Sequence, residues 1–353
     1  MKKTLLALAA LAATSAAFAQ SSVTLYGVLD ASLEKVKGDH QVTRVSSGNL
    51  ATSRLGFKGT EDMGGGLKTN FVLESAVSVD SGAAPTNRFF DRAAWVGLQG
   101  GAGELRLGRQ DSSIGVLAGD TSILGGQAYD DLKIVGTRAA AGYRRIDNAL
   151  TYLLPTMVPG VTAQLQYSTA GGYNTTLGSE AYGQPGNYTK NYGLNVKYQE
   201  GPVLAGLGYL SVVDDSASAG NQRANATLVF GGYDFGTFKT IAYYDGETAL
   251  AATPGLKRLS VYGIKAIVPV TADITVQAGV SKARNVTTGT TNLKGDNAEI
   301  TAIKAIYKLS KRTSVYGLTT IVNNGENAKT GIVAPTTGNR VAGGVAFGIA
   351  HAF

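Results

Sequence analysis

Cysteine is absent from this chain of 353 residues. Disulfides therefore cannot stabilise it in an oxidising compartment, and a large closed hydrogen-bonded sheet is one structure that could do so instead. Beyond its N-terminal segment the chain also lacks an uninterrupted apolar run near about 18 residues, so no transmembrane helix is predicted. If the protein crosses a membrane, we expect it to do so with strands.

Histidine is scarce as well, which argues against an enzyme. The two histidines are His40, in a short polar connection, and His351, close to the C-terminal end. Neither lies in a recognisable nucleophile motif, so the sequence gives little support to an outer-membrane hydrolase. No cluster of histidine and carboxylates has the spacing of a metal site, although calcium bound by loop aspartates stays open. We expect no catalytic residue, no cofactor and no metal site.

One glycine-rich segment, Gly64 to Thr69, hints at a phosphate-binding loop. Leu67 stands where such a loop has the glycine before its lysine, and the segment leads into an alternating strand instead of a helix. We therefore expect a tight turn here.

The N-terminus carries the pattern of an export signal. Lys2 and Lys3 precede an apolar run, and Ala17-Phe18-Ala19 ends it with a small-residue cleavage pattern. A membrane anchor is the alternative, but the run is shorter than the roughly 20 residues that span a bilayer as a helix. We expect residues 1–19 to be a signal peptide and residues 20–353 to be a single barrel domain.

The charge of the chain is modestly basic. Without Lys2 and Lys3, 30 of the 32 basic residues remain against 25 acidic ones, a net charge of about +5. The basic residues are spread singly and not clustered on one segment. This distribution, together with export, predicts no nucleic-acid partner.

Alternating polarity is the feature that recurs most often. In the segment 22–34, Leu25, Leu29 and Leu33 share one parity and Asp30 the other, as in a strand with one apolar and one polar face. Similar alternation returns at 67–77, 191–199 and 274–281. We count about sixteen candidate strands, an even number in the range of bacterial outer-membrane barrels.

The connections between these segments are of two kinds. Short ones carry turn residues, as in Pro159-Gly160 and Glu200-Gly201-Pro202, and also lie at 234–236 and 269–272. Long polar ones lie at about 169–190, 214–222, 285–297 and 324–338. Their alternation predicts tight hairpins on one side of a membrane and loose ones on the other. A soluble sandwich or β-helix is the competing fold, but the last strand ends on Phe353, which suits an aromatic girdle at the membrane interface.

Several segments resemble general diffusion porins of Gram-negative bacteria, especially the β-proteobacterial branch. The segment from Ser53 to Lys68 resembles their second hairpin, and Val23–Gly27, Leu107–Gln110 and the terminal Phe353 agree with it. The likeness departs at the ending, where the family is more basic, and in the loops. It implies a homotrimer of sixteen-stranded, all-β transmembrane antiparallel barrels in the outer membrane, each narrowed by a constriction loop folded inward.

The same resemblance implies a ladder of arginines on the pore wall facing acidic groups on that loop. The wall positions that match are Arg54, Arg92, Arg109 and Arg145, with Arg144 as a competitor for Arg145. Arg54 has the parity opposite to Leu55, so its side chain should point into water. Simple alternation would turn Arg109 outward, so a bulge near Gly108 is required. The loop should span about 111–143, with Asp120, Asp130 and Asp131 as its acidic candidates.

These features predict a passive diffusion channel for small hydrophilic solutes and ions. Fixed arginines opposite carboxylates would set up a transverse field, and a net positive lumen would favour anions mildly. Outer-membrane lipid and lipopolysaccharide are expected neighbours by location. The alternatives are a substrate-specific channel for sugars or organic acids, in which Tyr26, Tyr243 and Tyr262 would face inward, and less favourably an adhesin or the hydrolase considered above.

Overall fold

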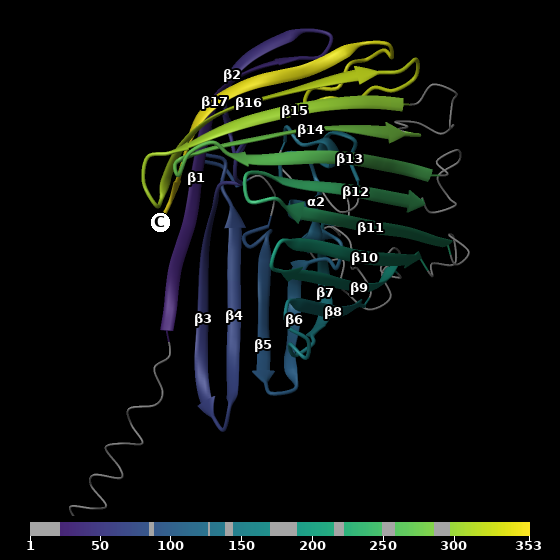
Figure 1. Ribbon diagram of the computed structural model, residues 1–353. Coiled ribbons are helices and arrows are strands. Elements are labelled where there is room, and N and C mark those ends of the chain that lie inside the picture. The colour runs from purple at the N-terminus through teal and green to yellow at the C-terminus, as the bar shows by residue number, and fades with distance from the viewer. Residues whose placement is uncertain are drawn as a thin grey trace, which may run out of the picture.

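The computed structural model describes residues 22–84, 88–125, 128–137, 144–169, 189–214, 222–248, 258–285 and 297–353. The expected signal peptide, residues 1–19, and most of three of the long polar connections lie outside these residues. The described part of the chain forms one antiparallel sheet that closes on itself (Figure 1).

The sheet contains seventeen strands. In chain order they are β1 Ser22–Lys37, β2 Gln41–Ser47, β3 Arg54–Gly64, β4 Leu67–Ala76, β5 Ala93–Gly100, β6 Gly103–Asp111, β7 Arg145–Leu153, β8 Val161–Ser168, β9 Thr189–Glu200, β10 Val203–Asp214, β11 Gln222–Asp234, β12 Lys239–Thr248, β13 Arg258–Pro269, β14 Ile274–Arg284, β15 Asn297–Lys308, β16 Thr313–Asn324 and β17 Val341–Ala352.

Pairing between β1 and β17 closes the sheet into a barrel. Their register runs from Val28 opposite Ala352 to Lys37 opposite Gly343. On its other side, β1 pairs with β2 at residues 31–37 and with β3 at residues 22–28, so β2 and β3 occupy one position in the ring. The barrel therefore has the sixteen strands expected from the sequence, plus one extra strand that arises from this division.

A six-residue segment, 48–53, separates β2 from β3 and is held on the inner side of the wall. The Asp30 carboxylate accepts hydrogen bonds from the backbone N–H groups of Leu50 at 2.6 Å and Ala51 at 2.8 Å. Asn49 donates to Glu34 Oε2 at 2.8 Å. Because such an insertion resets the pairing, β3 begins at Arg54 with a new register against β1.

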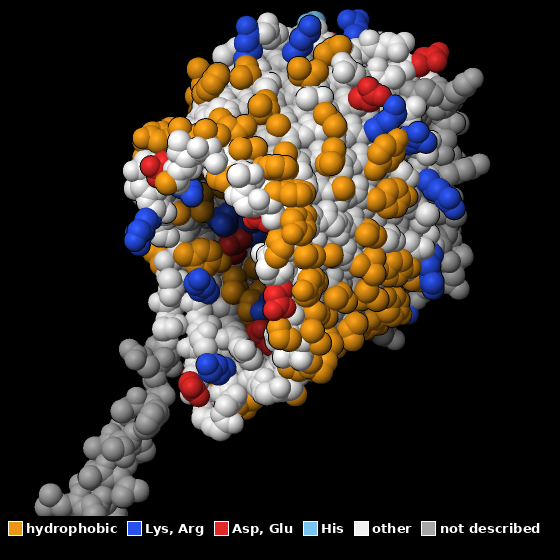
Figure 2. Space-filling view, in the orientation of Figure 1, with side chains coloured by type: hydrophobic (Ala, Val, Ile, Leu, Met, Phe, Trp, Pro, Cys, Tyr) orange, Lys and Arg blue, Asp and Glu red, His pale blue; other side chains and the backbone are white. Residues whose placement is uncertain are grey.

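The polarity of the barrel is inverted relative to a soluble protein. Outward side chains are apolar and exposed, among them Leu25 at 54%, Val96 at 50% and Phe347 at 66% (Figure 2). Inward positions carry buried polar groups such as Glu34 and Lys265. An apolar outer band around a polar interior is the arrangement of a membrane barrel, and it excludes the sandwich and β-helix.

Short turns join the strands at one end of the barrel (Figure 1). Gly64, Gly65 and Gly66 connect β3 to β4 with φ angles of 81°, 61° and 81°. These angles favour glycine, and the next element is a strand, which confirms the tight turn and rules out a phosphate-binding loop here.

The described helices are short and lie between β6 and β7. They are the 3-10 turn η1 Gly115–Leu117, α2 Ala118–Thr121 and α3 Asp131–Ile134. Within the described ranges, no helix is both long enough and apolar enough to cross a membrane.

Candidate functional site: the pore constriction

The described residues of the connection between β6 and β7, which are 112–125, 128–137 and 144, fold into the barrel, where the resemblance implied an inward loop over about 111–143. Ile114, Ile123, Tyr129 and Leu132 in this loop are completely buried. They belong to one cluster with buried apolar side chains on the inner faces of β10, β11, β12 and β13, and this contact packs the loop onto the inner wall. We call residues 112–144 the constriction loop.

Three consecutive carbonyl groups of the constriction loop are held by three consecutive strands. Lys265 on β13 donates to Ser122 O at 2.7 Å, and Lys304 on β15 donates to Leu124 O at 2.6 Å. Between them, Gln277 on β14 donates to Ile123 O. Each bond satisfies a backbone acceptor that would otherwise be buried without a partner. Together they fix the loop against this side of the barrel.

Tyr129 anchors the loop one step farther around the wall. Its hydroxyl donates to Glu34 Oε2 on β1 at 3.0 Å, and its carbonyl accepts from Thr320 Oγ1 on β16 at 2.6 Å. A Cβ built on Gly344 of β17 would lie 3.0 Å from the Tyr129 hydroxyl oxygen. The missing side chain at Gly344 therefore makes room for the tyrosine.

The three acidic loop candidates hold the loop in place. Asp120 binds Lys197 on β9 at 2.7 Å. Asp131 accepts from Ile123 N at 3.0 Å and from the Tyr243 hydroxyl on β12. Asp130 accepts from Leu124 N and Asp131 N at 3.0 Å each. Burial raises the pKa of the Asp130 carboxyl, and the neighbouring Asp131 raises it further.

This placement differs from the expected row of carboxylates facing the arginine ladder. The side chains of Asp130 and Asp131 have no solvent-accessible surface, so they cannot present charge to a passing solute. Both carboxylates accept hydrogen bonds from backbone N–H groups of the loop, and Asp131 also accepts one from Tyr243 on β12, so their oxygens are bound within the loop and against that strand.

The predicted wall arginines lie on the opposite arc, from β3 to β7, and they bind carboxylates of that same wall. Arg92 and Arg54 both approach Glu74 on β4, the latter at 3.5 Å. Arg145 lies 3.3 Å from Asp111 at the end of β6. Glu74 was recognisable in the sequence as an inward position, but its role as the partner of the ladder was not predicted.

A bulge in β6 turns the Arg109 side chain inward. The sequence required such a bulge, because simple alternation along the strand would have turned this side chain outward. Gly108 has a φ of 127°, and the register between β6 and β7 shifts between Gly108 and Gln110. The guanidinium then donates to Asp91 O at 2.7 Å and binds Asp147, which Arg88 also binds at 2.7 Å. Arg88 and Asp147 were not predicted, because nothing in their local pattern indicates the pairing.

An open pocket of about 320 Å³ separates the constriction loop from this wall. Its charged lining consists of four cations, Arg92, Lys133, Arg144 and Arg145, and one carboxylate, Asp91. Asp91 accepts a hydrogen bond from Ala76 N at 2.7 Å. We call this the cationic pocket. Figure 2 shows the barrel interior as a hollow that opens at the short-turn end, with charged side chains of both signs inside it.

Among the described residues of the constriction loop, Lys133 and Arg144 contribute cations to this pocket, and Lys133 was not predicted from the sequence. Burial lowers the pKa of the Lys133 ammonium, and Arg144 and Arg145 lower it further. The loop thus presents a positive charge to the arginine wall, where a negative one was expected. A pocket with this excess of positive charge attracts anions by simple Coulomb interaction.

The three tyrosines considered for a sugar track do not line one path. Tyr26 points inward and its hydroxyl donates to Glu74 Oε2 at 2.9 Å. Tyr243 is buried beneath the constriction loop. Tyr262 is exposed on the outward parity shared with Ile264, so it does not face inward as the alternative of a sugar channel required.

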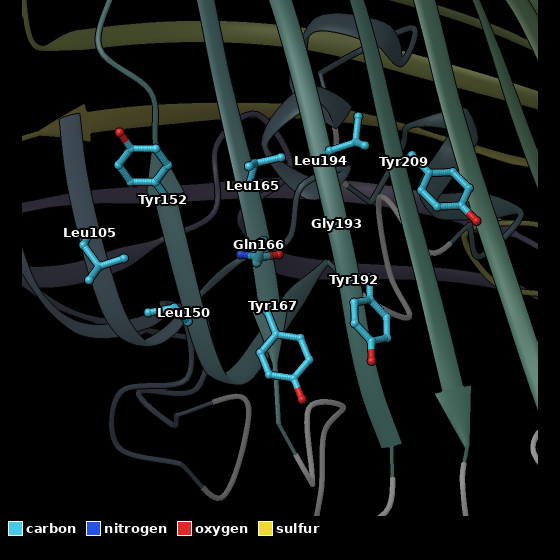
Figure 3. Close-up of a pocket in the computed structure, with 10 residues that line it drawn as sticks. All are labelled: Leu105, Leu150, Tyr152, Leu165, Gln166, Tyr167, Tyr192, Gly193, Leu194 and Tyr209. Atoms are coloured by element: carbon cyan, nitrogen blue, oxygen red, sulfur yellow. The ribbon is translucent and has the colours of Figure 1, made fainter. Parts of the chain in front are cut away.

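A second hollow lies on the outside of the barrel and is not a solute site. Leu105, Leu150, Leu165 and Leu194 form its middle (Figure 3). The hydroxyl of Tyr152 points to one end of the strands, and those of Tyr167 and Tyr192 point to the other. An apolar band between two tyrosine levels is the lipid-facing surface of a barrel.

Neither histidine forms part of a recognisable catalytic arrangement. His40 is exposed in the connection after β1, and His351 is exposed at the end of β17, with its Nδ1 2.9 Å from Thr313 Oγ1. Among the described residues, no group of three or more histidine or carboxylate side chains is arranged to hold a metal ion.

Comparison with known proteins agrees with this geometry. Residues 6–327 match the model of a family described as Gram-negative porin. Over the full length of both chains, the sequence is 31% identical to outer membrane porin protein 32 of Delftia acidovorans. It is 28% identical to major outer membrane protein P.IB of Neisseria lactamica, over 96% of this chain and 99% of that one.

The fold is likewise similar to that of solved porins. The anion-selective porin from Comamonas acidovorans superimposes with a TM-score of 0.77 at 24% identity, covering 95% of this chain and all of the other. The barrel, the lipid-facing band, the inward loop and these relatives confirm an outer-membrane, multi-pass passive channel and not an enzyme. The chain belongs to the family of Gram-negative porins.

Proposed function

We propose that this porin favours small hydrophilic anions over cations. The observation that supports the proposal is the cationic pocket, in which Arg92, Lys133, Arg144 and Arg145 surround the opening between loop and wall. The name of the solved porin from Comamonas acidovorans states the same preference for that protein. We assign the four predicted wall residues, Arg54, Arg92, Arg109 and Arg145, to this basic arc.

The preference arises from an excess of positive charge, and a field between opposite walls is not needed. Glu74, Asp111 and Asp147 lie on the same arc as the arginines and neutralise part of it locally. Arginine is suited to such a crowded site because it keeps its charge beside other cations. An anion that enters replaces part of its lost hydration with these fixed donors, which lowers its barrier relative to that of a cation.

Reversal potentials across a planar bilayer with a KCl gradient test the proposal. We expect chloride to be more permeant than potassium. Lys133→Glu should reduce the permeability ratio several-fold, because it exchanges a cation for an anion in the pocket. Lys311→Glu, in an exposed turn between β15 and β16, makes the same charge change away from the pocket and should have little effect. Potassium selectivity of the unaltered channel would contradict the proposal.

We also propose a homotrimer in contact with outer-membrane lipid and lipopolysaccharide. One solved structure with the same fold is described as a trimer form. Outward cations at the long-loop ends of the strands, Arg223, Arg258 and Arg284, are placed for lipid phosphates. Native mass spectrometry of the detergent-extracted protein measures both the subunit number and bound lipid. The mass of the mature chain also tests removal of residues 1–19.

A further inference from the structure

The only tryptophan of the chain projects into the pore. Trp95 lies on β5 between Ala94 and Val96, and Val96 is exposed on the lipid-facing side. Side chains alternate across a strand, so Trp95 faces the interior. The indole is partly exposed there and offers a flat apolar surface to solutes.

One positively charged side chain lies over this indole, and a second lies two strands away on the same inner wall. The register places Lys58 of β3 opposite Val72 of β4, and Val72 opposite Trp95. The three therefore form one row across the inner wall. From β6, the Arg106 guanidinium lies over the indole ring, 4.2 Å from its centroid.

A missing side chain allows Arg106 to adopt this position. A Cβ built on Gly97 would lie 3.0 Å from Arg106 Cγ and 3.1 Å from Glu104 Oε1. Glu104 in turn binds Arg106 at 2.7 Å and is itself largely buried. The carboxylate and Gly97 thus hold the guanidinium against Trp95.

Lys58 provides a less constrained charge. Its ammonium lies 5.4 Å from the centroid of the Tyr26 ring, its side chain is exposed, and it forms no ion pair within the part of the chain that the structure describes. Tyr26 is fixed by its bond to Glu74, on the side toward the cationic pocket. An anion that approaches from the short-turn end would therefore meet Lys58 before it meets the arginine wall.

These groups border a single hollow of about 450 Å³. Its charged lining consists of Lys58, Arg106 and Glu104, and Trp95, Asn70 and Gln99 also border it. Glu104 is bound to Arg106, so the two cations leave the hollow with one excess positive charge. A concave site with this charge, an aromatic surface and several amide or hydroxyl groups matches a small molecule that has both a flat ring and a negative charge. Chloride or acetate could use the cations alone but would leave the indole without a partner.

We propose that this hollow binds aromatic carboxylates next to the constriction, on its short-turn side. The ring stacks on the exposed part of the Trp95 indole, and the carboxylate binds Lys58 and Arg106. The site concentrates such solutes beside the cationic pocket, so the proposal rests on the anion preference proposed above and specifies one class of anion. Stacking on the indole should make benzoate bind at least about tenfold more tightly than acetate.

Trp95 is its own reporter, because no other tryptophan contributes to the fluorescence of the intact channel. We expect benzoate to change the emission with saturation, and acetate or the neutral benzyl alcohol to do so only at much higher concentration. Arg106→Gln should weaken benzoate binding several-fold. Arg312→Gln, exposed beside the turn before β16, is the matched control and should leave it unchanged.

Bilayer recordings give a second readout that does not need the tryptophan. Benzoate added on the short-turn side should lower the chloride current more than acetate does, and Trp95→Leu should remove this difference. Equal effects of benzoate and acetate on the unaltered channel, or an unchanged difference in Trp95→Leu, would overturn the proposal. Reversal potentials in KCl are measured on the same membranes without benzoate. Anion selectivity with equal benzoate and acetate effects therefore refutes only the aromatic site, whereas potassium selectivity refutes the proposed function.

Discussion

Two arcs of the same barrel use positively charged side chains in different ways. On β13 and β15, Lys265 and Lys304 donate to loop carbonyl groups and lie under the constriction loop. On the arc from β3 to β7, arginines bind wall carboxylates but still border an open pocket. A cation that points inward is therefore not by itself a selectivity residue. Its function depends on whether the loop covers it.

The strongest test of this difference between the two arcs is to remove Lys265 and Lys304, the lysines that lie under the constriction loop. In a Lys265→Met and Lys304→Met double variant, two buried charged hydrogen bonds are lost, each worth about 1.5–3 kcal/mol. We expect the constriction loop to detach from β13 and β15, the single-channel conductance to rise by roughly half or more, and the barrel to denature at a lower temperature.

Lys311→Met is the control for this double variant, because Lys311 is exposed in a turn. An unchanged conductance in the double variant would mean that the packing of Ile123 and Tyr129 is sufficient to hold the loop. The role assigned here to the covered lysines would then be wrong.

A smaller effect is expected from pH at the uncovered arc. The pKa of Lys133 is lowered from its ordinary 10.5 by burial and by Arg144 and Arg145. A lowered pKa means that the ammonium loses its proton at a lower pH than a free lysine would. The anion preference should therefore begin to fall below pH 10.5, while the arginines stay charged.

Reversal potentials measured from about pH 7 to about pH 10.5 follow this change. Lys133→Arg should keep the anion preference constant over the range, because its guanidinium does not titrate there. A decline of equal size in Lys133→Arg would show that another group is responsible.

The sequence predicted the direction of side chains on the wall strands better than it predicted the contacts of the constriction loop, and the reason is physical. Alternation is a local property of a strand, so it placed Arg54 inward, and the conflict at Arg109 correctly required a bulge at Gly108. The contacts of the loop are not local. Lys265 and Ser122 are 143 residues apart, and Lys304 and Leu124 are 180 apart.

For the same reason the charge of the constriction was only partly predicted. Between residues 112 and 144 the sequence has three aspartates, one lysine and two arginines, and no local pattern shows which of these side chains will be buried. Asp130 and Asp131 turn into the loop because backbone N–H groups there need acceptors. Lys133, two residues after Asp131, is left facing the arginines.

The smallest effect is expected from Asp130→Asn. This variant tests whether the Asp130 side chain is buried in the loop, as in the structure, or presents its charge to the pore. The raised pKa of Asp130 shows that burial disfavours its charged form, so a neutral side chain of the same shape costs little. The amide that replaces the carboxyl would keep an oxygen that accepts from Leu124 N and Asp131 N. We expect the reversal potential in KCl to change by less than that of Lys133→Glu, and the denaturation temperature to remain close to that of the unaltered barrel. A large gain in anion preference would instead show that Asp130 presents its charge to the pore, as the resemblance to other porins had implied.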